Sequence, residues 1–186
     1  IIPDEKNPRK AKVQYLVDMK NPYLIDTVTY ERFTPDLLNT LQAGQQRTLL
    51  HVGKQFNAIT LDEERTRLSS LLRNRGYYYY RPDYFSFLAD TTLVPGKISM
   101  KIVPKAGVPK EALRKWNVGD IAVHLNGVYG EAPNDSMMYK DLKIYYYDKL
   151  KVRPDVLYKQ LRFHPSQTYS YFRDTRTQER ITQSGM

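Results

Sequence analysis

Apolar residues recur at helical spacing in the middle of the chain, at Leu61, Leu68, Leu71 and Leu72. Thr60, followed three residues later by Glu63, has the spacing of a capping box, so we expect the helix to begin there. Gly76 comes after the last apolar turn, where a left-handed C-terminal cap favours a residue without a Cβ atom. The pattern predicts one capped helix that ends just before Gly76.

The composition changes after this helix to a run of aromatic residues from Tyr77 to Leu88. Aromatic residues at this density are typical of a strand. A turn at Val94-Pro95-Gly96 follows, and Lys97 to Val103 is a second apolar segment. The pattern therefore predicts a β-hairpin after the helix.

The segment before this helix predicts another strand and a shorter helix. Residues Tyr23 to Tyr30 alternate between apolar and polar side chains, as a half-buried strand does. Pro35 then opens a helix at the first position, where proline is tolerated, and Gly44 is expected to close it. The loop from Gly53 to Phe56 leads into the central helix.

The same order of elements returns in the last third of the chain. Trp116 to Val123 matches the strand that begins at Tyr23, 93 positions earlier, and Pro154 matches Pro35 with an offset of 119. Tyr169 stands for Phe56, and a helix is expected from about Ser170 to Gly185. The larger offset implies an insertion of 26 residues between Gly127 and Leu150, in which Leu142 to Tyr147 predicts a strand or hairpin. Self-similarity of this kind indicates repeated units.

We therefore divide the chain into three parts. Residues 1–20, with a loop to residue 10 and a strand from Lys12 to Asp18, are expected to be the last strand of a preceding repeat. Residues 21–105 form a complete repeat, and residues 106–186 form a second repeat with the insertion near 127–150. The second repeat is expected to lack its hairpin at the C-terminus, which would leave a sheet edge unpaired. The sequence is thus expected to be a fragment of a longer protein.

Composition narrows the range of functions only slightly. The 186 residues carry a formal net charge of +9, which favours an anionic partner such as nucleic acid, acidic lipid or an acidic protein. The alternative is an ordinary solvated basic surface. The absence of cysteine excludes disulfides and thiolate metal sites. The chain also has no apolar run long enough for a transmembrane helix.

The order strand, helix, helix, strand, strand resembles the polypeptide-transport-associated (POTRA) repeat. The Gly53-x-x-Phe56 loop and Gly76-Tyr77 carry this resemblance, and the run Leu71 to Tyr78 with Pro95-Gly96 is similar to the BamA/TamA superfamily of outer-membrane assembly factors. The resemblance covers about residues 20–105 fully and residues 106–186 in part. It implies an α+β fold of tandem POTRA-like repeats, each with a three-stranded mixed sheet and two helices on one face.

The resemblance also implies a function without catalysis or cofactors. In that family the repeats lie in the periplasm, ahead of a C-terminal membrane barrel that this sequence lacks. They guide unfolded outer-membrane polypeptides and dock partner lipoproteins. We therefore expect a periplasmic binding and scaffolding module of an assembly factor, a secretion-partner transporter or a surface antigen.

The candidate binding site is an exposed sheet edge at Tyr77 to Leu88. Pro82 cannot donate to a ladder and is rarely found in a central strand. An extended client could pair with this edge through main-chain hydrogen bonds. The residues expected to contact the client are Tyr77, Tyr78, Tyr79, Tyr80, Arg81, Tyr84, Phe85 and Phe87. The alternative is that these aromatic residues only pack the sheet on its helices.

Other classes of function have weaker support. Arginines among tyrosines can bind single-stranded nucleic acid, but no RNP signature or Gly-x-x-Gly clamp is present, so no nucleic acid is expected. His51, His124 and His164 lack metal-ligand spacing, and Asp62, Glu63 and Glu64 are interpreted as first-turn helix charges. We therefore expect no enzyme and no metal site. Trp116 is interpreted as an anchor at the junction between the repeats, with a partner hot spot as the alternative.

Overall fold

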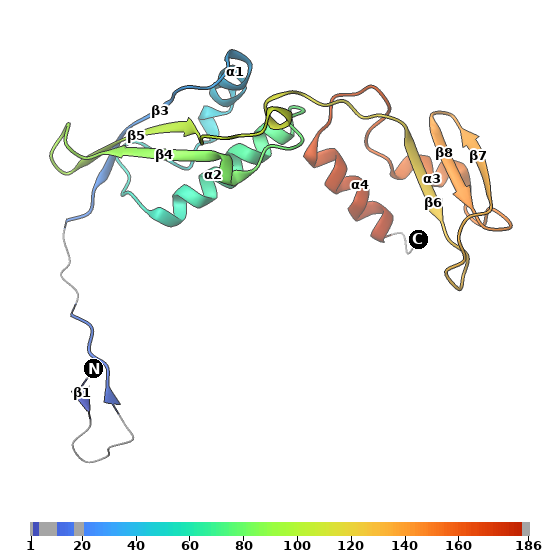
Figure 1. The fold of residues 1–186 in the computed structure, drawn as a ribbon, viewed down its shortest axis with the longest axis horizontal. Helices are drawn as coiled ribbons and strands as arrows, with labels where there is room; N and C mark the ends of the chain where they lie inside the picture. Colours follow the sequence, from blue (N-terminus) through green and yellow to red (C-terminus); the bar gives the residue numbers. More distant parts are fainter. Residues whose placement is uncertain (1, 4–10, 17–20, 184–186) are drawn as a thin grey trace.

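The computed structural model describes residues 2–3, 11–16 and 21–183. A short pair, β1 (Ile2–Pro3) and β2 (Ala11–Lys12), precedes two larger units. The first unit contains β3 (Leu24–Tyr30), α1 (Pro35–Ala43), α2 (Ala58–Arg73), β4 (Phe85–Asp90) and β5 (Lys97–Pro104). The second contains β6 (Ile121–Leu125), β7 (Asp135–Tyr139), β8 (Leu142–Tyr146), α3 (Pro154–Gln160) and α4 (Tyr171–Gln183) (Figure 1). Short 3-10 turns are η1 (Gln45–Arg47), η2 (Pro82–Tyr84) and η3 (Lys110–Leu113).

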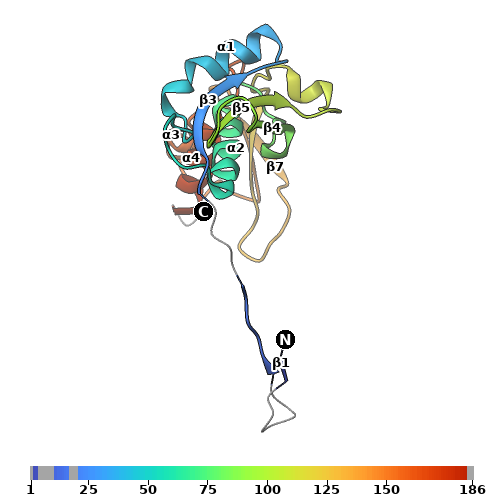
Figure 2. The ribbon, with the colours of Figure 1, turned by 90° about the vertical axis from the view of Figure 1, so that its left-hand side faces the viewer.

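The sheet of the first unit has the strand order β3-β5-β4 (Figure 2). The central strand β5 runs parallel to β3 and antiparallel to β4. The predicted strand at Tyr23 to Tyr30 and the hairpin around Pro95-Gly96 are confirmed. The α+β fold with mixed three-stranded sheets is also confirmed.

One hydrophobic core joins this sheet to its two helices. On β5 every second residue is buried, at Ile98, Met100 and Ile102, so that one face of the strand turns inward. Leu37 and Leu41 of α1, with Leu68 and Leu72 of α2, pack into the same cluster. The opposite face of β5 carries Lys97 and Lys101, which form ion pairs across the strands with Asp26 and Glu31.

The residues at the helix ends determine where α1 and α2 begin. Pro35 occupies the first turn of α1 and Gly44 caps its C-terminus, as predicted. The capping box at Thr60 is wrong, because α2 begins at Ala58 and the Asn57 side chain accepts a hydrogen bond from the Ile59 amide at 2.9 Å. Asparagine is a stronger N-cap than threonine, which explains the earlier start. Asp62, Glu63 and Glu64 consequently do not lie in the first turn, and that interpretation is also wrong.

The second sheet repeats this arrangement with a different chain order. Its strand order is β6-β8-β7, with β8 parallel to β6 and antiparallel to β7. The hairpin of β7 and β8 comes from the predicted insertion, and it precedes the helices α3 and α4 instead of following them. The expectation that this unit contains only one of its three strands is therefore wrong. The strand predicted from Trp116 is also shorter than expected and begins at Ile121.

Backbone hydrogen bonds reproduce the internal repeat. The Phe56 amide donates to the Tyr23 carbonyl at 2.8 Å, and the Tyr169 amide donates to the Trp116 carbonyl at 2.9 Å. The residue three positions before each of these donors has a positive φ, 80° at Gly53 and 66° at Ser166. An equivalent loop therefore docks on the segment that leads into the first strand of each unit.

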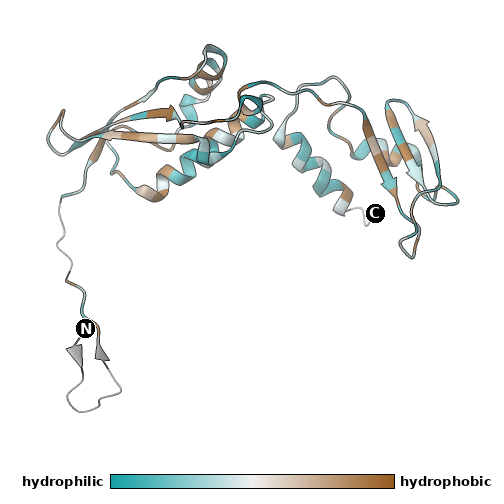
Figure 3. Ribbon diagram, viewed as in Figure 1, coloured by the Kyte–Doolittle hydropathy of each residue, from teal (hydrophilic) through white to brown (hydrophobic). Residues whose placement is uncertain are grey.

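The second core is smaller and rests on the sheet and α3. Its buried members are Ile121, Leu142, Ile144, Leu157 and Leu161, and none of them belongs to α4. Figure 3 shows α4 as largely hydrophilic. Figure 1 shows α4 between the first unit and the sheet of the second.

The N-terminal prediction is only partly covered by the described residues. Of the strand expected at Lys12 to Asp18, Lys12 lies in β2, residues 13–16 form no strand, and residues 17–18 lie outside the described chain. Most of the loop expected for residues 1–10 also lies outside it. Among the helices that the structure describes, none combines the length and hydropathy needed to span a bilayer.

Candidate functional site

The aromatic run after α2 does not form the predicted strand. Residues 77–84 form turns and a 3-10 helix, and β4 begins only at Phe85. Gly76, with φ 101°, reverses the chain, and the Tyr80 amide donates to the Tyr77 carbonyl. Tyr77 and Tyr80 are each 1% exposed and belong to the first core. The strand prediction for residues 77–84 is therefore wrong, because burial of these two rings against the helices requires a turn.

The exposed sheet edge is β4 itself. The Lys105 amide donates to the Tyr84 carbonyl, so the alternation of an antiparallel ladder directs the backbone groups of Phe85, Phe87 and Ala89 away from β5. The Phe85 amide is satisfied by the Pro82 carbonyl, which leaves Phe87 and Ala89 with both groups unpaired by a strand in the described chain. Leu88 is 45% exposed on this strand. Of the other predicted contact residues, Arg81 is exposed before η2 and Tyr84 is half-buried against Tyr80. The strand thus offers free hydrogen-bonding groups beside apolar surface.

Tyr78 and Tyr79 lie at the junction between the two units. The Tyr78 ring packs edge-on against Tyr169 with centroids 4.7 Å apart, and Tyr79 packs against Trp116 at 5.3 Å. These four rings line a hollow of about 270 Å³ together with residues of the second unit. Of the four consecutive tyrosines from Tyr77 to Tyr80, two are therefore core residues and two contact the next unit.

Main-chain contacts fix the same junction. The Trp116 amide donates to the Gly76 carbonyl at 2.8 Å, and the Trp116 indole donates to the Glu111 carbonyl at 2.9 Å. Ala112, in the linker between the units, is fully buried in the first core. The linker thus packs on the first unit and places Trp116 against the end of α2.

Asn74 connects the two units through a helix cap. It is the C-cap residue of α2, and its side-chain oxygen accepts hydrogen bonds from the Phe172 amide at 2.7 Å and the Ser170 hydroxyl at 3.3 Å. It therefore satisfies an amide at the N-terminus of α4 from the other unit. Arg73 adds a contact over the Tyr171 ring at 4.0 Å. The sequence offered no signal for this cap, because 98 positions separate Asn74 from Phe172.

Replacing Asn74 by alanine should destabilise the second unit by about 1 kcal/mol, the usual value of an N-cap. The measurement is urea denaturation followed by the fluorescence of the single tryptophan. Asn39→Ala, a surface change on α1, is the control. An unchanged midpoint for Asn74→Ala would show that α4 does not depend on this cap.

The junction also predicts a dependence on alkaline pH. Burial, together with the hydrogen bond from its hydroxyl to Asp174, raises the pKa of Tyr169 to about 12. Because the pKa of Tyr169 is higher in the folded than in the unfolded protein, this residue contributes to stability below pH 10. The contribution is lost as the pH approaches 12. The stability difference between the wild type and Tyr169→Phe should therefore shrink from pH 10 to pH 12. A difference that is constant over this range would contradict the prediction.

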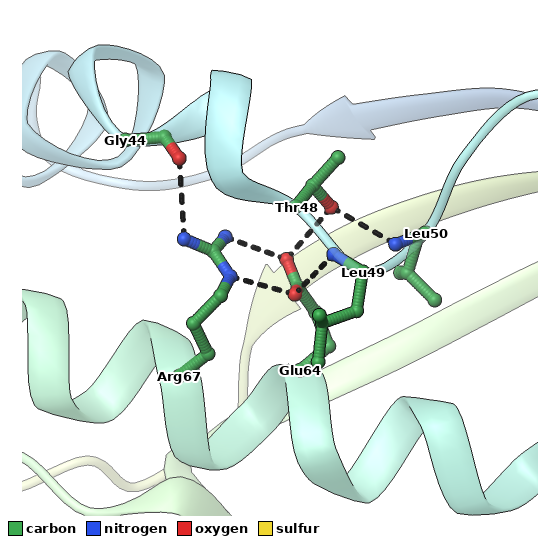
Figure 4. A network of polar contacts seen from close by, with 6 residues as sticks. All are labelled: Gly44, Thr48, Leu49, Leu50, Glu64 and Arg67. Atoms are coloured by element: carbon green, nitrogen blue, oxygen red, sulfur yellow. Dashed lines mark hydrogen bonds and ion pairs between the residues drawn. The ribbon is translucent and has the colours of Figure 1, made fainter.

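A buried ion pair in the first unit was missed in the sequence. Glu64 has no exposed side-chain surface, and it accepts hydrogen bonds from Arg67 Nε and Nη2, each at 2.7 Å (Figure 4). Thr48 Oγ and the Leu49 amide also donate to this carboxylate. The hydrogen bond to Glu64 raises the pKa of Arg67. One signal was present, because Glu64 falls on the apolar stripe of α2.

The histidines and carboxylates do not converge on a catalytic arrangement in the described chain. His124 stacks on Tyr145, and His51 is exposed. His164 Nδ1 lies 3.1 Å from both Tyr158 Oη and an Asp141 oxygen. Within residues 21–183 no group of three acidic, histidine or cysteine side chains could hold a metal ion.

Comparison with known structures identifies the fold. The chain superimposes with a TM-score of 0.51 on BamA POTRA3-5 from Haemophilus influenzae, at 12% sequence identity, over 88% of this chain and 51% of that one. The chain has the POTRA fold. It thus spans about half the length of this similar structure. No model of a protein family matches the sequence, and no curated protein matches it.

Two structures of Omp85 domains match with lower scores. The N-terminal domain of Omp85 from Thermosynechococcus elongatus aligns at 10% identity and a TM-score of 0.31, over 90% of this chain and 88% of that one. POTRA1-3 of Omp85 from Anabaena aligns at 10% identity and a TM-score of 0.26, over 88% and 85%.

Proposed function

We propose that this chain is a non-catalytic, periplasmic binding and scaffolding module of an outer-membrane protein assembly or translocation factor. Its clients would be unfolded outer-membrane polypeptides, and partner lipoproteins of an assembly complex would dock on the same repeats. The POTRA fold supports this assignment. We also propose repeat boundaries at residues 21–105 and 106–186, with the hairpin of residues 135–146 as the insertion.

The open edge of β4 carries the proposal. Phe87 and Ala89 present amide and carbonyl groups, and Phe85 presents its carbonyl group; no strand pairs these groups within the described chain. The Phe85 amide instead donates to the Pro82 carbonyl. An extended polypeptide could add to this edge as a fourth strand, with main-chain hydrogen bonds for affinity. Half-buried Phe87, which lies under the Arg65 guanidinium at 5.0 Å, and exposed Leu88 would contact alternate client side chains. The proposed contact region is thus residues 85–90, shorter than the run that includes Tyr77 to Arg81.

Replacing Ala89 by proline should abolish this strand addition. Because the Ala89 amide points away from β5, proline removes a client hydrogen bond without removing one from the sheet. The assay is titration of the ¹⁵N-labelled chain with a peptide of alternating valine and threonine, with amide shifts expected at residues 85–90. Ala89→Val, which keeps the amide, is the matched control. Unshifted amides in the wild type at millimolar peptide would refute strand addition at β4.

A further inference from the structure

Arginine side chains gather around a hollow on α4 of the second unit. Arg173, Arg176 and Arg180 follow one side of the helix, and Arg162 reaches the hollow from the segment after α3. The hollow has a volume of about 440 Å³. Among these four arginines, Arg176 alone forms an ion pair within residues 21–183, with Glu179 at 3.0 Å. The wall is completed by Phe172, Glu179 and Gln183.

The equivalent place in the first unit holds an internal carboxylate. The offset of 113 positions that relates Phe56 to Tyr169 also relates Glu64 to Thr177 and Arg67 to Arg180. Both arginines donate to a carbonyl at the end of the preceding helix, Arg67 to Gly44 and Arg180 to Lys159, each at 3.1 Å. Within residues 21–183 only Arg67 of these two also has a carboxylate partner, because the position of Glu64 is a threonine in the second unit.

A hydrogen bond from a backbone amide to the side chain at the position of Glu64 is present in both units. The Leu49 amide donates to Glu64 at 3.0 Å, and the Arg162 amide, 113 positions later, donates to the Thr177 hydroxyl at 3.0 Å. Thr177 is buried and neutral, so it does not balance the charge of Arg180. The second unit therefore keeps both hydrogen bonds, the one from the arginine and the one from the backbone amide, but has no carboxylate at the position of Glu64. Its arginines instead line the open hollow on α4.

We propose that this hollow binds carboxylate side chains from an acidic segment of a partner protein. Guanidinium groups match carboxylates with two parallel hydrogen bonds, the geometry that Glu64 and Arg67 form in the first unit. Four arginines and one glutamate leave a net charge of +3 around the hollow. This surface lies on α4 and is separate from the edge of β4.

The first test is binding of an N-acetylated hexaglutamate peptide at low ionic strength, with hexaglutamine as the neutral probe. Hexaglutamate should shift the amides of residue 162 and residues 172–183, and binding should weaken as salt is added. The double variant Arg173→Gln/Arg176→Gln should bind about tenfold more weakly, because each exposed ion pair contributes up to about 1 kcal/mol. It leaves the hydrogen bond of Arg180 to α3 intact.

A matched control separates the site from net charge. Lys149→Gln/Lys151→Gln removes two exposed charges from the same unit, outside the hollow, and should bind hexaglutamate nearly as the wild type does. Ala89→Pro should also bind normally, which separates this site from strand addition at β4. Equal loss in the lysine and arginine double variants would overturn the proposal. Arginine-dependent binding of phosphatidylglycerol vesicles or inorganic phosphate without binding of hexaglutamate would overturn it as well.

A variant that introduces a carboxylate at position 177 provides the second test. Thr177→Glu should recreate the ion pair that Glu64 and Arg67 form in the first unit. The new carboxylate should accept hydrogen bonds from the Arg162 amide and the Arg180 guanidinium. The variant should raise the urea midpoint of the second unit and weaken hexaglutamate binding by about tenfold. Thr177→Val, of similar size but uncharged, is the control and should keep the affinity. Unchanged affinity in a folded Thr177→Glu variant would refute the assignment.

Discussion

Replacement of Glu64 by alanine is expected to lower the free energy of unfolding of the first unit by about 3–5 kcal/mol, because it leaves Arg67 without its carboxylate in a mostly buried place. The Arg67 side chain is only 18% exposed and cannot move fully into water without breaking its contact with α1. The Thr48 hydroxyl and the Leu49 amide also lose their acceptor. Urea denaturation followed by circular dichroism measures the change.

Two further variants distinguish this cause from a general effect on α2. Glu63→Ala removes an exposed neighbouring carboxylate and should change stability by less than about 0.5 kcal/mol. The double variant Glu64→Leu/Arg67→Met removes both charges and should recover much of the loss, since apolar replacement of a buried pair is often neutral. A Glu64→Ala variant that is as stable as Glu63→Ala would show that the ion pair is unimportant.

Replacement of Gly76 by alanine is expected to destabilise the protein by about 2–3 kcal/mol and to disturb the junction. The backbone of Gly76 has φ 101°, which strains any residue with a Cβ atom. A Cβ atom there would lie 2.8 Å from Thr168 Cγ2 and 3.2 Å from Lys115 Cβ, which both lie within residues 106–186. The change should also alter the emission of Trp116, whose amide donates to the Gly76 carbonyl.

Gly53 offers a matched control for this prediction. It has a φ of 80°, but a Cβ atom added there meets nothing within 4 Å. Gly53→Ala should therefore cost about 1–2 kcal/mol from backbone strain and leave Trp116 emission unchanged. Equal losses in the two variants, with unaltered tryptophan emission in both, would mean that close approach at Gly76 is not important.

Local sequence patterns determined most of the first unit. The alternation from Tyr23 to Tyr30, the leucine stripe of α2 and the Val94-Pro95-Gly96 turn each predict an element that the structure contains. The internal repeat is also visible in the sequence, and in both units an equivalent loop docks on the segment before the first strand. Such features depend on residues that are neighbours in the chain or recur at fixed spacing.

Tertiary structure alone decided which conformation the aromatic run adopts and which strand the inserted hairpin pairs with. Tyr77 and Tyr80 have the composition of a strand, but the core between the sheet and the helices buries them in a turn. The hairpin from Asp135 to Tyr146 completes the second sheet because its β8 strand pairs with β6, a choice of partner that strand propensity does not specify. Contacts between distant segments also place Asn74 on α4 and pair Glu64 with the Thr48 loop. These interactions depend on where the chain folds back on itself, which local periodicity does not encode.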